Sequence, residues 1–288
     1  SDYISNQQGL LIDFVKRTDK KTGIIVGDGV RYEIAAHVAA ALDKQCNIVK
    51  NIILADMPSE TEHNMSALYV GNNEVIPIHK DREKRLSEIT GKTIDYLNLE
   101  SLHRGIESNC LVLTYKDIDS AGEKLQQGAI KLFSEFEKVL IEKIELLLKM
   151  GYEVHLVTDH GFVLTGILDE ANKIDTTTDG KKEVHERFLR TVEKQYNNDW
   201  LRFDKKYKEY NYIYVAKRDK PFKSRGVYGF SHGGFTPQEV IIPHFIFQKE
   251  QSATTGLAVQ IINKSELSAV TGDFFAIKLN GTSKKKDL

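Results

Sequence analysis

The sequence predicts an α/β fold in which a central, mostly parallel sheet is flanked by helices. Short apolar runs at residues 23–27, 51–55 and 110–115 have the length of buried strands. Residues 123–150 carry apolar side chains at every third or fourth position, which predicts a long amphipathic helix. Another apolar run follows at 152–157, and a strand, a helix and a strand in this order are typical of a parallel βαβ crossover.

Local signals predict the remaining elements of the main sheet. Residues 32–42 are rich in alanine and predict a helix after the first strand. Ser59 and Glu62 have the spacing of a capping box, so we expect a helix to begin there. Residues 239–247 are apolar and β-prone, and Pro243 within them predicts an edge strand because proline has no N–H to donate.

Residues 169–225 interrupt this alternation and are interpreted as a cap insertion in the main domain. Between residues 181 and 225 there are fourteen Lys or Arg and seven Asp or Glu, and we expect this charged segment to be helical. Alternating apolar residues near the end predict a small C-terminal β appendage. The expected division is a main domain at 1–250 and an appendage at 251–288, part of a truncated region of a longer protein.

Composition narrows the class of protein. Of 288 residues, 41% are hydrophobic and 28% charged, which is the mixture of a globular chain and excludes a disordered one. Forty basic and forty-one acidic residues argue against a surface that binds nucleic acid everywhere. Cys46 and Cys110 are too few for a disulfide framework. Neither a membrane span nor a signal peptide is recognisable, so we expect a cytoplasmic protein with no membrane partner.

Potential metal ligands follow four of the predicted strands or turns. They are Asp28, Asp119, Asp159, His160 and His232. Ligands of open parallel sheets bind beyond the carboxyl ends of the strands, so these side chains are expected to converge. Converging carboxylates repel one another unless a cation compensates, and a mixture of carboxylate and imidazole suits zinc or manganese. Taken singly, each residue could instead be a helix cap or a hydrogen-bonded histidine.

Five segments, in order along the chain, resemble the motif set of PglZ domains, a branch of the alkaline phosphatase superfamily. The segments are residues 28–31 (DGVR), 58–61 (PSET), 119–123 (DSAGE), 158–161 (TDHG) and 232–239 (HGGFTPQE). The likeness extends from about residue 23 to residue 247. It implies an alkaline-phosphatase-like fold and a metal-dependent phosphoester hydrolase.

The resemblance implies two divalent metal ions. One ion would be bound by Asp28, Asp159 and His160 together with the nucleophile, and the other by the three remaining ligands, Asp119, Glu123 and His232. Glu123 departs from the histidine that the superfamily's phosphodiesterases have at this point. A carboxylate is a chemically harder donor than an imidazole and makes the site less selective for zinc, so manganese is an alternative to zinc.

The resemblance also implies a hydroxyl nucleophile, and Thr61 is our prediction, with Ser59 as the alternative. Both hydroxyls could instead cap the helix. Arg31 is predicted to contact a phosphate oxygen, although an ion pair with Glu33 would explain it equally well. Asp117 is interpreted as a carboxylate that orients a ligand or is merely solvated.

The basic cap suggests the class of substrate. Lys205 and Lys206, among interleaved aromatic residues, are predicted to bind a nucleotide, oligonucleotide or nucleic acid, unless the aromatic side simply packs on the domain. The prediction is therefore a phosphodiesterase; the alternatives are a phosphomonoesterase and a non-catalytic interaction module. The PglZ resemblance further implies phage defence of the BREX type or signalling, with defence proteins or fused domains as partners.

Three other histidines are expected to be structural. His155 alternates with apolar residues inside a predicted strand, and His244 follows Pro243 in another. Both are interpreted as hydrogen-bonded core residues. His63 is expected on the surface of the helix that follows the nucleophile.

Overall fold

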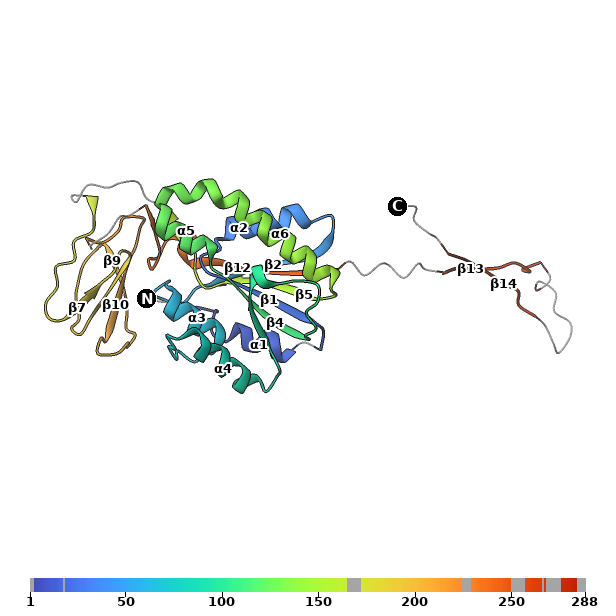
Figure 1. Cartoon of the computed structure of the whole chain (residues 1–288), viewed down its shortest axis with the longest axis horizontal. Helices are drawn as coiled ribbons and strands as arrows, with labels where there is room; N and C mark the ends of the chain where they lie inside the picture. Colours follow the sequence, from blue (N-terminus) through green and yellow to red (C-terminus); the bar gives the residue numbers. More distant parts are fainter. Residues whose placement is uncertain are drawn as a thin grey trace. The chain divides into compact units, whose positions relative to one another are not determined.

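The computed structural model describes residues 3–17, 19–164, 172–223, 229–249, 257–265, 267 and 276–283. The chain divides into two compact units, residues 1–249 and 250–288. Figure 1 shows that the first unit contains a helix-flanked sheet and a separate small sheet. No helix within the described ranges is both long and apolar enough to cross a bilayer.

A six-stranded sheet forms the centre of the first unit, in the order β2-β12-β5-β1-β4-β3. β1 pairs in parallel with β4 and β5, β3 pairs in parallel with β4, and β12 runs antiparallel between β5 and β2. The bounds are β1 Thr22–Gly27, β2 Cys46–Leu54, β3 Asp95–Asn98, β4 Cys110–Tyr115, β5 Glu153–Thr158 and β12 Ile241–Lys249. The predicted mostly parallel α/β sheet is confirmed.

Helices cover both faces of this sheet (Figure 1). One face packs against α2 (Tyr32–Leu42) and α6 (Phe133–Lys149), the other against α1 (Leu10–Arg17), α3 (Thr61–Tyr69) and α4 (His79–Thr90). The long helix predicted at 123–150 is three elements: α5 (Asp117–Leu125), the 3-10 helix η2 (Gln126–Leu132) and α6. A short 3-10 helix, η1 (Leu99–Ser101), follows β3.

Pro243 lies in a strand that has neighbours on both sides, so the predicted edge position is wrong. Pro243 pairs with Ile52 of β2, but the ladder between β12 and β5 begins only at His244. The missing N–H of Pro243 therefore falls just outside the second ladder, which is how a proline is accommodated within a sheet.

The cap is a β-sheet, so the expected helical structure is wrong. Its antiparallel strands have the order β7-β8-β10-β9, with bounds β7 Lys182–Val184, β8 Phe188–Thr191, β9 Trp200–Phe203 and β10 Tyr212–Ala216. Trp200, Tyr214 and Phe222 form a buried cluster on one side of it. The aromatic residues thus act mainly as the core of the cap, and parts of the predicted insertion, 169–171 and 224–225, lie outside the described residues.

Short elements complete the chain. β6 (Val163–Leu164) pairs with β11 (Phe230–Ser231), and α7 (Pro237–Val240) leads into β12. In the second unit β13 (Leu257–Ile261) pairs antiparallel with β14 (Leu279–Ser283). These two strands lie in the segment for which the sequence predicts a small β appendage, and the assignment of 251–288 as an appendage stays a prediction.

Candidate active site

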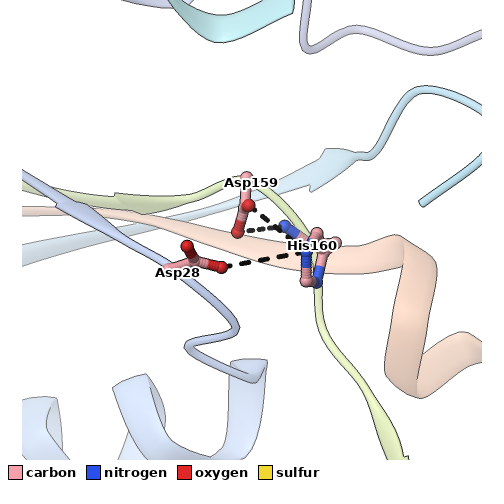
Figure 2. Close-up of side chains that lie close together, drawn as sticks. All are labelled: Asp28, Asp159 and His160. Carbon is pink, nitrogen blue, oxygen red and sulfur yellow. Dashed lines mark hydrogen bonds and ion pairs between the residues drawn. The ribbon is translucent and has the colours of Figure 1, made fainter. Parts of the chain in front are cut away.

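The first group of predicted ligands lies at the carboxyl ends of β1 and β5. Gly27 and Thr158 are register partners at the ends of these strands, so the residues that follow them, Asp28 and Asp159, emerge side by side. Asp28, Asp159 and His160 each offer one ligand atom, and these atoms lie within 4.8 Å of one another (Figure 2). All three side chains are buried.

The backbone around this group fixes one oxygen of Asp159 and leaves the other available. Asp159 Oδ1 accepts hydrogen bonds from the N–H groups of Gly29, at 3.1 Å, and His160, at 2.8 Å. Gly29 has a φ of 73°, a conformation that glycine adopts without strain. Asp159 Oδ2 is buried, lies 3.3 Å from His160 Nε2 and accepts no hydrogen bond from any of the residues that the structure describes. A buried carboxylate oxygen without a partner is costly, which is the condition that a bound cation would relieve.

The electrostatics of the group favour a cation. Burial raises the pKa of Asp28 well above its ordinary value, and the charges of Asp159 and Asp119 raise it further. Burial likewise raises the pKa of Asp159 to about 6, and burial with the charge of His232 lowers the pKa of His160 to about 3. A neutral imidazole and two carboxylates are the donors that zinc and manganese take. These residues therefore fit a divalent ion.

The second group of predicted ligands is only partly assembled. Asp119 lies in the first turn of α5. Its Oδ1 is 3.8 Å from His232 Nε2 and has no hydrogen-bond partner within the described part of the chain. The rings of His160 and His232 stack with centroids 4.1 Å apart, which places the two groups next to each other. Glu123, one turn further along α5, is exposed and lines the cavity that His232 also lines.

Of the two candidate nucleophiles, Thr61 faces the first group of predicted ligands. Its Oγ1 lies 3.1 Å from His160 Nε2 and 3.4 Å from Asp28 Oδ1. Ser59 is fully buried, and its hydroxyl donates to Gly234 O at 2.8 Å. The predicted capping box is wrong, because Glu60 occupies the N-cap position of α3 and makes no side-chain cap bond.

The predicted substrate contacts have other partners here. Arg31 Nε donates to Glu33 Oε2 at 3.1 Å, which is the alternative that the sequence left open. Lys205 Nζ donates to Asp56 Oδ2 at 2.5 Å, and Lys206 lines the same cavity as this ion pair. Binding of substrate by Arg31, Lys205 and Lys206 stays a prediction, and Asp117 is exposed at the start of α5.

A buried ion pair between the cap and the loop that carries His232 could not be recognised from the sequence. Arg187, beside β8, donates through Nε and Nη2 to the two oxygens of Glu239, at 2.9 and 2.8 Å, and both side chains are fully buried. Glu239 also accepts from the N–H groups of Gly234 and Thr236. The resemblance included Glu239 in a motif without a role, and nothing distinguished Arg187 from the other basic cap residues.

The same loop supports the turn that carries His160. Gly161 N donates to Glu239 O at 2.9 Å. An ideal Cβ on Gly161 would lie 1.9 Å from Gln238 O, so only glycine fits this contact. The Arg187–Glu239 pair therefore connects the cap with both predicted ligand groups.

A second network ties the cap to the residues around Thr61. Glu60 accepts a hydrogen bond from Arg190 of β8 and lies 2.5 Å from His63 Nδ1. Burial alone would raise the pKa of Glu60, but the hydrogen bond with His63 and the charge of Arg190 lower it to about 2. His63 is 2% exposed, so its predicted surface position is wrong. Tyr207 OH in turn donates to Glu62, on the other side of Thr61.

His155 and His244 form a hydrogen-bonded pair on β5 and β12. His155 Nδ1 lies 3.0 Å from His244 Nε2, and His155 Nε2 lies 3.3 Å from Glu153 Oε1. The ring of Phe14 stacks on both imidazoles. Their interpretation as satisfied core histidines is confirmed.

The family profile described as "BREX system PglZ alkaline phosphatase-like domain" matches residues 97–247, more than half of the chain. The chain belongs to the PglZ family. The matched range includes five of the predicted metal ligands of this PglZ domain, whereas Asp28 and Thr61 precede it and are brought to the site by the fold. A comparison with curated protein sequences finds no match.

Solved structures with a similar fold include mammalian ectonucleotide pyrophosphatase/phosphodiesterase 5. The murine protein matches with a TM-score of 0.53 at 12% identity, over 80% of the PglZ domain chain and 88% of its own. The human protein has a TM-score of 0.51 at 13% identity and the same coverage. An inactive threonine-to-alanine variant of the murine protein, in complex with AMP, matches with a TM-score of 0.52 at 12% identity and with the same coverage of both chains. These likenesses show a shared alkaline-phosphatase-like fold, which with the family match supports a phosphoesterase.

Proposed function

We propose that this PglZ domain is a metal-dependent phosphodiesterase that acts on nucleotides or oligonucleotides, with Thr61 as its nucleophile. The observation that carries the proposal is the position of Thr61 Oγ1, 3.1 Å from His160 Nε2 and 3.4 Å from Asp28 Oδ1. The murine fold neighbour that binds AMP as an inactive threonine-to-alanine variant supports a nucleotide substrate and a threonine nucleophile.

The first group of predicted ligands fits a divalent ion, zinc or manganese, and we propose that a second ion binds beside it. Asp28, Asp159 and His160 would hold one, and the other would be held by the remaining predicted ligands, Asp119, Glu123 and His232. When bound, such ions supply Lewis-acid stabilisation of the phosphoryl charge and favour ionisation of a nearby hydroxyl.

The chain's own groups would position and activate the nucleophile. Asp28 Oδ1 accepts a hydrogen bond from Thr61 Oγ1 and so aims the hydroxyl into the site. Thr61 is the first residue of α3, where backbone N–H groups lack partners within the helix and favour an anion. Attack forms the Oγ1–phosphorus bond and breaks the bond to the leaving oxygen. Water then cleaves the phosphothreonine, releasing a monoester and regenerating Thr61.

The test compares bis(p-nitrophenyl) phosphate with p-nitrophenyl phosphate after loading the purified chain with zinc or manganese. We expect the diester to be the better substrate, and Thr61→Ala to lower its turnover by at least ~1000-fold while metal content by elemental analysis stays unchanged. Thr177→Ala, at an exposed threonine of the cap, is the matched control. Retained turnover in Thr61→Ala would remove Thr61 as nucleophile, and preference for the monoester would indicate a phosphomonoesterase.

The family description refers to the BREX system, and we propose that the domain acts in phage defence or signalling, together with other proteins or fused domains. The corresponding test is phage plating on cells that carry the intact parent gene or its Thr61→Ala version. Equal protection by both would mean that the domain contributes binding and not hydrolysis.

A further inference from the structure

Two carboxylates flank Thr61 along the chain, and each is bound by a side chain of the cap. Arg190 donates through Nη2 to Glu60, and the hydroxyl of Tyr207 donates to Glu62. We propose that Arg190 and Tyr207 are positioning residues, which hold these carboxylates away from the first turn of α3 and leave its N–H groups open to the phosphate of the substrate. The inference rests on the proposed attack by Thr61, because it concerns the anion that this residue would receive.

The start of α3 is where a loose carboxylate would interfere. The first N–H groups of a helix have no acceptor within the helix, and the positive end of its dipole attracts anions. Glu60 occupies the N-cap position and Glu62 the first turn, but the side chain of Glu60 makes no cap hydrogen bond. A carboxylate that reached these N–H groups would take the place of the phosphate and repel it.

Arg190 is fixed within the cap. It lies on β8, is 3% exposed, and donates through Nη1 to Glu183 of β7 at 3.1 Å. Its guanidinium carbon lies 4.3 Å from the ring centroid of Tyr207 and 4.8 Å from that of Phe188. The donors of a guanidinium have a fixed planar arrangement, so a confined arginine holds the carboxylate of Glu60 in one place.

Glu60 carries its charge close to the predicted metal ligands. Burial would raise its pKa, but the hydrogen bond with His63 and the charge of Arg190 lower it to about 2, so the group is ionised at neutral pH. Burial lowers the pKa of His160, and the charge of Glu60 partly opposes this shift. His63 belongs to α3, so its contact keeps Glu60 near the helix, whereas Arg190 draws the carboxylate toward the cap.

Tyr207 acts on the other side of Thr61. Its ring lies 4.9 Å from that of His63, centroid to centroid, and its hydroxyl reaches Glu62. Burial and the hydrogen bond with Glu62 raise the pKa of Tyr207, so the hydroxyl keeps the proton that it donates. A neutral hydroxyl directs a carboxylate but does not compensate its charge, so we expect Tyr207 to have the smaller effect.

Inorganic phosphate is the probe, because it resembles the transferred group and its binding needs no turnover. Calorimetry with the zinc-loaded or manganese-loaded chain gives the dissociation constant and the number of sites separately. We expect Arg190→Met to weaken phosphate binding about tenfold and Tyr207→Phe about threefold, with the number of sites unchanged. Arg202→Met, at an arginine of β9 that pairs with Asp204, is the matched control and should bind phosphate like the parent chain.

A second substitution separates positioning from a structural role. Adding Glu60→Gln to Arg190→Met removes the charge that the cap no longer holds, so phosphate affinity should return to within about threefold of the parent chain. The kcat/KM for bis(p-nitrophenyl) phosphate should fall in Arg190→Met and recover in the double variant. Damage to the fold would instead lower the number of binding sites and the unfolding temperature, and removing one charge would not restore either.

Parent-like affinity in Arg190→Met, no recovery in the double variant, or no phosphate binding by the parent chain would overturn the inference even if the diester is hydrolysed. Tyr207→Phe removes one oxygen atom and decides the matter if Arg190→Met does not fold, since unchanged affinity there would also overturn it. Absence of hydrolysis in the parent chain, with the expected pattern of phosphate affinities, would instead reject the proposed activity and keep the role of the cap.

Discussion

Two pairs of stacked histidines lie in this PglZ domain, and they differ in what surrounds them. His160 and His232 stack with centroids 4.1 Å apart, and His155 and His244 with centroids 5.3 Å apart, both nearly parallel. The second pair is joined by a hydrogen bond of 3.0 Å and covered by the ring of Phe14. Both ring nitrogens of His155, and Nε2 of His244, have partners within the protein.

The first pair lies among carboxylates that the protein does not satisfy. Asp159 Oδ2 and Asp119 Oδ1 are buried and have no hydrogen-bond partner among the described residues, and burial raises the pKa of both Asp28 and Asp159. Similar stacking of the imidazole rings therefore occurs in two different environments. Unsatisfied carboxylates are the feature expected at a ligand site, whereas hydrogen bonds within the protein are the feature expected of core histidines.

The largest effect should follow from removing one unsatisfied carboxylate. Asp159→Asn keeps the size of the side chain but removes a charged ligand, so we expect loss of the ion at the first position and at least ~1000-fold slower diester hydrolysis. Elemental analysis and turnover measure these effects. Asp95→Asn, at an exposed aspartate that starts β3, is the isosteric control. Unchanged metal content in Asp159→Asn would contradict the contrast between the two histidine pairs, because the surroundings of His160 and His232 would then bind no ion, like those of His155 and His244.

A smaller effect should follow from breaking the Arg187–Glu239 ion pair, which connects the loop that carries His232 with the turn that carries His160. Glu239→Gln removes the charge that compensates buried Arg187, which we expect to lower the free energy of unfolding by about 3–5 kcal/mol. In the folded fraction the second ion should bind about tenfold more weakly. Thermal unfolding and metal titration check both effects, and the double variant Arg187→Met with Glu239→Gln should recover stability without recovering metal affinity. Full metal affinity in Glu239→Gln would show that the pair has a structural role alone.

The smallest effect concerns the pH dependence of stability, to which the hydrogen-bonded pair of His155 and His244 contributes. Burial, and then the charge of His155, lowers the pKa of His244 to about 4 from an ordinary 6.5, so the unfolded chain binds the proton more readily than the folded one. Stability contributed by neutral His244 is present above pH 6.5 and is lost as pH falls toward 4, by at most about 3 kcal/mol. Denaturant unfolding at several pH values should show a flatter dependence in His244→Gln, with metal content unchanged. An identical slope in variant and parent would contradict this assignment.

The sequence predicted the parts of the site that depend on local pattern. Strand ends could be located from apolar runs, so Asp28, Asp159 and His160 were expected to meet, and they do. The cap strands are only three to five residues long and rich in charge, so periodicity could not identify them. The ion pairs between the cap and the core could not be predicted from the sequence for a related reason. Arg187 and Glu239 are 52 positions apart, and no local signal pairs them.

The charge of the cap shows the same limit. Counting charges over 181–225 gives a basic segment, but the count says nothing about which side chains turn inward. Folding directs Arg187 and Arg190 into buried ion pairs and leaves Glu186 beside His232. The net charge of a segment is therefore a poor guide to which of its charged side chains are compensated within the fold.

The Arg187–Glu239 pair also limits how this domain can be recombined. A cap held on by surface contacts could be exchanged between homologues as an independent module. Here the insertion supplies the buried counter-charge for a carboxylate of the core, together with the packing against Gly233 and Gly234. Grafting a foreign cap, or shortening this one, would leave Glu239 charged in an apolar interior, so cap and core must be inherited together.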